Sequence, residues 1–103
     1  MPRYRECRAV IRSDDGSPPI EDDDVEVRIS EGRILLFYWD DRGAMVFEGR
    51  EQEGGAFELR ARTRPRTARL ALAADRRVLE GTWCERDESG ELRIELGEEE
   101  GSA

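Results

Sequence analysis

The side chains that most often carry out catalysis are missing from this sequence. It has no histidine, and all 17 of its basic residues are arginine, so it has no lysine either. Without histidine, the Ser-His-Asp and Cys-His arrangements of nucleophilic catalysis cannot form. Without lysine, neither a Schiff base nor a phosphate-loop lysine is available. We therefore expect a protein that is not an enzyme, with no catalytic residue and no cofactor.

Ligands for a metal ion are present, but their spacing does not predict a site. Asp14, Asp15 and residues 21–24 form two acidic clusters that do not fit the EF-hand loop for Ca²⁺. Such clusters are typical of solvated loops. The two cysteines, Cys7 and Cys84, fall short of the about four nitrogen or sulfur ligands that a structural zinc site needs. We expect no metal, and we expect both thiols to be free.

Arginines gather in one stretch between residues 60 and 69. On a strand, every second residue points to the same face, where glutamates of neighbouring strands can pair with arginines. The alternative is an anion or nucleic-acid contact, which the net charge of -8 disfavours because it repels phosphates. We predict cross-strand ion pairs with Glu48, Glu58 and Glu80. The arginines of this stretch are Arg60, Arg62, Arg64, Arg66 and Arg69.

The composition also limits where the protein works. A chain of 103 residues fits one domain. Its longest apolar run, residues 34–39, is far shorter than the roughly 20 residues of a membrane-spanning helix. The charged start of the chain has no apolar segment typical of a secretion signal. We expect a cytoplasmic protein without a membrane or nucleic-acid partner.

Apolar and polar residues alternate in eight short segments, which is the pattern of β-strands with one buried face. Short turn sequences rich in Gly, Asp and Pro separate most of them, so neighbouring strands should be antiparallel. The sequence predicts an all-β fold, an antiparallel up-and-down meander of about eight strands that forms a barrel or a barrel-like sandwich. The domain should span residues 1–97, with 98–103 as a disordered acidic tail. The segments are residues 7–12, 25–29, 34–39, 45–48, 57–61, 70–72, 79–83 and 92–96.

The longest connection and the glycines inside strands add detail to this prediction. Residues 13–24 carry two prolines and are expected to form an acidic link. Gly49 and Gly81 interrupt two of the strands, where a glycine often marks a bend or a close backbone approach. In a closed meander of eight strands the first strand pairs with the eighth and not the seventh. Cys7 and Cys84 should therefore not be bonded to each other.

One strand carries a family resemblance. The run Leu79-Glu80-Gly81-Thr82-Trp83, followed by a polar turn and residues 92–96, resembles the Gly-x-Trp strand of calycin barrels, the lipocalin and avidin-like families. The resemblance implies a barrel-like shape with a small apolar cavity, and it carries over no binding residue. The alternation itself places Trp83 in the core and Cys84 on the opposite face.

Residues 34–39 are apolar on both faces of the predicted strand, so one apolar triad must face away from the core. Either the N-terminal strand, the 13–24 link or a second sheet covers this triad, or a partner does. The register is open, because a one-residue bulge would exchange the two faces. One triad is Ile34, Leu36 and Tyr38, and the other is Leu35, Phe37 and Trp39.

Two functions are compatible with these features. The first is an interaction module that binds another protein, or a second copy as a homodimer, through Leu35, Phe37 and Trp39. The alternative is a lipocalin-like barrel that binds a small apolar ligand in its cavity. Lining candidates for that cavity are Tyr38, Trp39, Phe47, Phe57 and Trp83.

Overall fold

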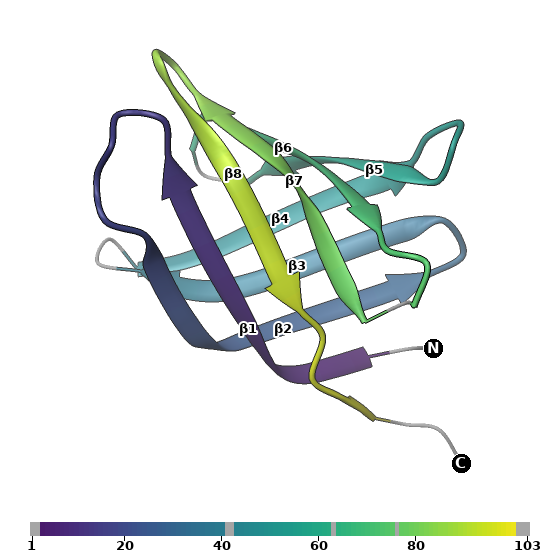
Figure 1. The fold of residues 1–103 in the computed structure, drawn as a ribbon. Helices are drawn as coiled ribbons and strands as arrows, with labels where there is room; N and C mark the ends of the chain where they lie inside the picture. The colour runs from purple at the N-terminus through teal and green to yellow at the C-terminus, as the bar shows by residue number, and fades with distance from the viewer. Residues whose placement is uncertain (1–2, 41–42, 63, 76, 101–103) are drawn as a thin grey trace.

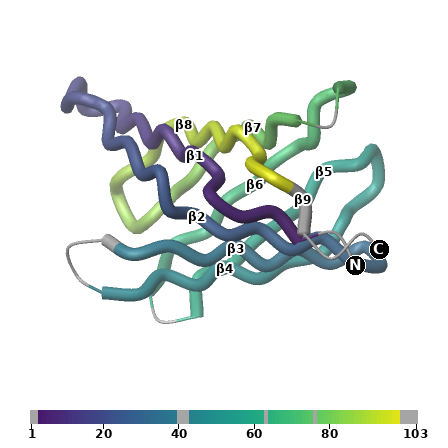
Figure 2. Tube along the Cα trace, turned by 90° about the horizontal axis from the view of Figure 1, so that it is seen from below, coloured from purple at the N-terminus to yellow at the C-terminus, as the bar shows by residue number. Residues whose placement is uncertain are grey.

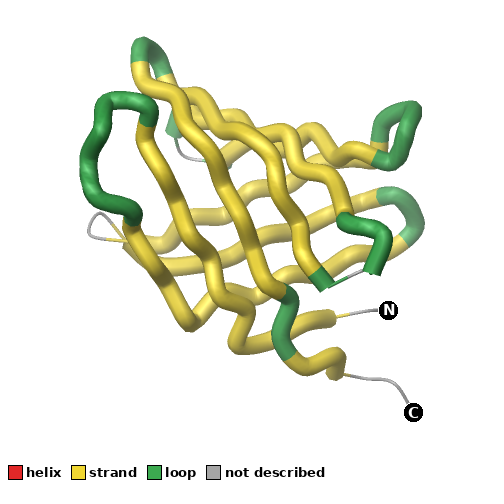
Figure 3. Tube along the Cα trace, viewed as in Figure 1, coloured by secondary structure: helices red, strands yellow, loops and turns green. Residues whose placement is uncertain are grey.

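The computed structural model describes residues 3–40, 43–62, 64–75 and 77–100, and all the regular structure in these residues is β-strand (Figure 3). The described part of the chain therefore contains no helix long and apolar enough to span a membrane. The strands are β1 (Arg3–Ser13), β2 (Ile20–Ser30), β3 (Arg33–Asp40), β4 (Gly43–Glu51), β5 (Ala56–Ala61), β6 (Arg66–Leu72), β7 (Val78–Glu85), β8 (Glu88–Glu95) and β9 (Glu98–Glu100).

Consecutive strands from β2 to β8 are antiparallel neighbours, and β1 closes the sheet by pairing with both β8 and β2 (Figure 1). Ile11, for example, lies opposite Leu92 in one ladder and opposite Ile20 in the other. Closure leaves β1–β8 without a free edge. The predicted meander of eight antiparallel strands is confirmed, and it forms a barrel.

The barrel interior holds the hydrophobic core. Figure 2 shows β1, β7 and β8 on one side of the barrel and β2, β3 and β4 on the other. Each strand from β1 to β8 sends apolar side chains between these two sides, because alternate residues of a strand point inward. The burial of each large apolar side chain contributes about 1.5–3 kcal/mol. Fully buried examples are Val27, Leu36, Phe47, Leu70 and Ile94.

Two glycines allow neighbouring strands to approach closely. A Cβ atom at Gly49 on β4 would collide with the backbone of Glu58 and Leu59 on β5. A Cβ atom at Gly81 on β7 would collide in the same way with the backbone of Arg69 on β6. The close approach that the strand glycines predicted is therefore confirmed at both positions.

The acidic link and the acidic tail differ from their predictions. The link was expected to span residues 13–24, but β1 extends to Ser13 and β2 begins at Ile20, so its acidic second half belongs to a strand. The tail was expected to be disordered from residue 98, but Glu98–Glu100 pairs with residues 3–5 of β1 as β9. Neither segment has the apolar alternation from which strands were predicted. Pairing with β1 extends the strands there, and Arg8 of β1 also forms an ion pair with Glu21 of β2. Residues 101–103 lie outside the described residues.

Candidate functional site

The structure fixes the register of β3. Ile34, Leu36 and Tyr38 face the core and are at most 4 % exposed, whereas Leu35 and Phe37 on the outer face are half-buried. Trp39, the third outward residue, is 60 % exposed. Of the two registers left open by the sequence, the one that directs Leu35, Phe37 and Trp39 outward is therefore correct.

Apolar residues of β4 extend this outward triad. Val46 lies opposite Phe37, and Ala44 lies opposite Trp39. The rings of Phe37 and Trp39 meet edge to face, with centroids 6.0 Å apart and an interplanar angle of 86°. We call these residues the outer strip: Leu35, Phe37, Trp39, Ala44 and Val46.

Ion pairs border the outer strip on both sides. On β2, Glu26 accepts hydrogen bonds from Arg3 at 3.0 Å and from Arg28 at 2.9 Å. Desolvation raises the pKa of Glu26, but the hydrogen bonds and charges of Arg3 and Arg28 together lower it below its ordinary value. On β4, Glu48 accepts a hydrogen bond from Arg62 at 3.1 Å, which lowers the pKa of Glu48. An apolar centre with a charged rim is the usual anatomy of a protein interface.

Four of the five proposed ligand-lining residues gather inside the barrel, whereas the fifth, Trp39, is exposed on its outer face. Tyr38, Phe47, Phe57 and Trp83 are each at most 5 % exposed. Tyr38 and Phe47 stack with centroids 6.3 Å apart. These side chains are packed within the core cluster, where they contribute to the filling of the barrel. Burial of Trp83 is confirmed.

The two cysteines lie on opposite sides of the barrel wall. Cys7 is buried, whereas Cys84 is exposed, as predicted from the alternation in β7. Both thiols are free. Burial raises the pKa of the Cys7 thiol, although its sulfur accepts a hydrogen bond from the Gly97 amide at 3.2 Å. Among the described residues, no group of three or more carboxylate or cysteine side chains is arranged to hold a metal ion.

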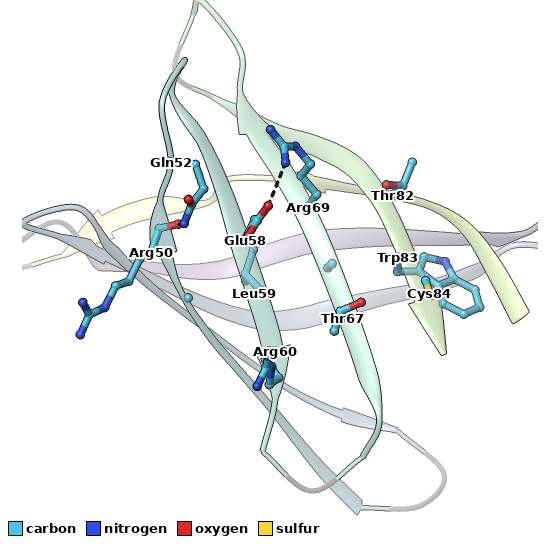
Figure 4. Close-up of a pocket in the computed structure, with 12 residues that line it drawn as sticks. Arg50, Gln52, Glu58, Leu59, Arg60, Thr67, Arg69, Thr82, Trp83 and Cys84 are labelled. Atoms are coloured by element: carbon cyan, nitrogen blue, oxygen red, sulfur yellow. Dashed lines mark hydrogen bonds and ion pairs between the residues drawn. The ribbon is translucent and has the colours of Figure 1, made fainter. Parts of the chain in front are cut away.

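The arginine stretch forms ion pairs, although not all with the predicted partners. Arg62 pairs with Glu48, and Arg69 pairs with Glu58 at 2.9 Å, as predicted. Glu80 instead lies 3.8 Å from Arg93, because β8 as well as β6 borders β7. Figure 4 shows residues that line an open depression over β4, β5, β6 and β7, with the Arg69–Glu58 pair among them.

Arg66 belongs to a different environment from the rest of the stretch. Its side chain is only 13 % exposed, and its Nε donates to the Glu85 carboxylate at 3.1 Å. Its guanidinium lies 4.7 Å from the centroid of the Trp83 ring. The sequence did not distinguish this half-buried arginine from the exposed Arg60, Arg62 and Arg69.

The sequence also missed a cleft at one end of the barrel, where Arg66, Trp83, Trp39 and Ile20 come together. The available signal was Ile20 itself, an apolar residue isolated between two prolines and an acidic run. Comparisons of the chain with protein-family models, with curated proteins and with solved structures gave no match.

Proposed function

We propose that this chain is a non-enzymatic protein-interaction module that contacts its partner through the outer strip. The observation that carries the proposal is that three alternate apolar residues of β3 face outward, of which Leu35 and Phe37 are half-buried and Trp39 is exposed. The chain is otherwise rich in charge, with 41 % charged residues. When a partner covers a contiguous apolar surface, the removal of that surface from water favours association.

A second copy of the chain is the partner that we propose first. A two-fold axis would bring the strip of one copy onto the strip of the other, so that like apolar residues meet. The charge of -8 on each copy opposes this contact. Because salt screens that repulsion and leaves apolar burial intact, association should strengthen as salt is raised.

Sedimentation velocity over a range of concentrations, at low and at high salt, tests this proposal. We expect the wild type to form a dimer more readily at high salt, and the double variant Phe37→Thr/Trp39→Thr to stay monomeric. Threonine keeps the strand preference of β3 while it removes the apolar rings. The matched control Glu58→Thr/Arg69→Thr removes an outward ion pair from β5 and β6 without a change in net charge, and it should dimerise like the wild type.

A wild-type chain that remains monomeric at every concentration and salt level would contradict self-association. Capture of a different protein that is lost in the Phe37→Thr/Trp39→Thr variant would then still support the interaction module. If neither is found, the outer strip is not a contact surface.

The closed eight-strand barrel supports a second candidate, a calycin-like carrier of a small apolar ligand. Tyr38, Phe47, Phe57 and Trp83 would line its cavity. Because these side chains are buried against one another and their neighbours, a ligand would have to displace them. An apolar fluorescent probe that binds at one site and shifts the NMR signals of these aromatic rings would favour the carrier over the module.

A further inference from the structure

The two large apolar side chains that are most exposed in the described part of the chain line the same cleft. Ile20 is 63 % exposed and Trp39 is 60 % exposed. The cleft has a volume of about 470 Å³, which is within the range of small-ligand sites. It lies at the end of the barrel where the β1–β2 connection and the β7–β8 hairpin project (Figure 1).

The floor of the cleft is apolar and held in place. Tyr38 and Trp83 are buried there, and Ile11 lies beside them on β1. The Trp83 Nε1 donates a hydrogen bond to the Arg12 carbonyl oxygen at 3.0 Å, which fixes the orientation of the ring. Because these side chains are already fixed before a ligand binds, binding would cost little side-chain conformational entropy.

The positive charge in the cleft is already neutralised. Arg66 is the one basic residue that lines it, among the residues that the structure describes. Its guanidinium is engaged by the Glu85 carboxylate and by the Trp83 ring. Trp83 thus already has a cation beside its ring, whereas Trp39 at the cleft mouth is exposed.

The negative charge at the rim is not neutralised. Four carboxylates line the cleft, and one of them, Glu21, is paired with Arg8 at 2.6 Å. The other three, Asp15, Asp22 and Glu88, have no ion-pair partner within the described residues. Hydrogen bonds from Ser17 to Asp15 lower the pKa of that carboxyl, so it is ionised at neutral pH. The rim therefore repels anions and attracts cations.

We propose that this cleft binds a small organic cation, an ammonium or guanidinium group carried on an apolar body. The apolar body would lie against Ile11 and Ile20, above Tyr38. The positive group would lie between the Trp39 ring, as a cation–π contact, and the carboxylates of Asp22 and Glu88. This site is separate from the outer strip except for Trp39, which borders both.

Three probes of similar size separate charge from shape. Phenethylammonium carries a cation on an aromatic body, phenethyl alcohol is its neutral counterpart, and hydrocinnamate is an anion. Each is titrated into the wild-type chain, and backbone amide NMR signals report which residues respond. We expect phenethylammonium to shift the signals of Ile20, Asp22 and Trp39, and to bind about tenfold more tightly than the alcohol. Hydrocinnamate should not bind.

A pair of variants with equal charge tests the rim. Asp22→Asn/Glu88→Gln removes two rim carboxylates, and Glu51→Gln/Glu53→Gln removes two exposed carboxylates at the β4–β5 turn. The first pair should weaken phenethylammonium binding by about tenfold, and the second should change it less than about twofold. Asparagine at position 22 keeps a side-chain oxygen for the hydrogen bond from the Asp24 amide.

Several outcomes would overturn the proposal. These are equal affinity for phenethylammonium and phenethyl alcohol, shifts that fall outside the cleft, and equal effects of the two variant pairs. If the Asp22→Asn/Glu88→Gln chain does not fold, the salt dependence of binding to the wild type tests the role of the rim. The affinity of the wild type for phenethylammonium should then fall as salt rises, and an affinity that does not depend on salt would refute a role for the rim.

Discussion

The outer face of β3 and the outer face of β5–β7 belong to the same closed sheet, but they offer different chemistry to a partner. On β5 and β6, outward residues such as Glu58 and Arg69 pair with each other. On β3, outward Phe37 and Trp39 contact each other and leave Trp39 largely exposed. The charged groups of one face form ion pairs with each other within the chain. The apolar side chains of the other face are stabilised when a partner removes them from water. The alternation of buried residues therefore sets the fold, and the choice of outward residues sets what each face can bind.

The two tryptophans give the largest contrast between the regions. Trp83 fills the interior beneath the charged face, and Trp39 stands on the outer strip. Trp83→Ala should lower the free energy of unfolding by about 3–5 kcal/mol, which is enough to unfold much of a domain this small. Trp39→Ala should change it by no more than about 0.5 kcal/mol. Chemical denaturation of both variants measures the difference, and equal losses would contradict the assignment of the two faces.

The two thiols provide a second contrast, in their rates of chemical labelling rather than in stability. Cys84 is exposed on β7, whereas Cys7 is buried and its pKa is raised by that burial. Because the thiolate is the reactive form, a thiol-specific reagent should label Cys84 at once and Cys7 only after unfolding. Mass spectrometry of the native chain over time follows both sites, and a Cys84→Ser variant isolates the slow one. Rapid labelling of Cys7 in the folded chain would show that β1 does not close the barrel as described.

The ion pair between Glu48 and Arg62 gives the smallest expected effect. The hydrogen bond and charge of Arg62 lower the folded-state pKa of Glu48 below its unfolded value. The pair therefore contributes stability at neutral pH, and that contribution is lost as the pH falls through the range where the carboxyl takes up a proton. Because both side chains are exposed, Arg62→Gln should lower the melting temperature by no more than about 2 °C at neutral pH.

In acid the Arg62→Gln chain and the wild type should melt together. Arg60→Gln is the matched control, because it removes the same charge from a residue with no ion-pair partner in the described part of the chain. A larger drop for Arg60→Gln than for Arg62→Gln would mean that net charge, and not the pair, controls stability.

The sequence predicted the antiparallel meander but not the cleft. Alternation such as that of Leu79, Gly81 and Trp83 is local, so it predicted antiparallel strands and their buried faces from neighbouring residues alone. It left a barrel and a barrel-like sandwich as alternatives, and the pairing of β1 with both β8 and β2 decides for the barrel. The register of β3 could not be read from side-chain types, because both of its faces are apolar and a one-residue bulge would have exchanged them. The cleft joins Ile20, Trp39 and Arg66 from three separate strands, and their meeting depends on how the barrel closes. The strand β9 has no apolar residue, so no pattern indicated it.

The indole NMR signals of the two tryptophans test the role of the outer strip most directly. The Trp83 indole is hydrogen-bonded inside the barrel, and the Trp39 indole is exposed on the strip. As the wild-type concentration is raised at high salt, the Trp39 signal should move together with the amide signals of Leu35, Phe37 and Val46, while the Trp83 signal stays fixed. Signals of the outer strip that do not move at any concentration, or movement confined to the charged face of β5–β7, would contradict self-association through this strip.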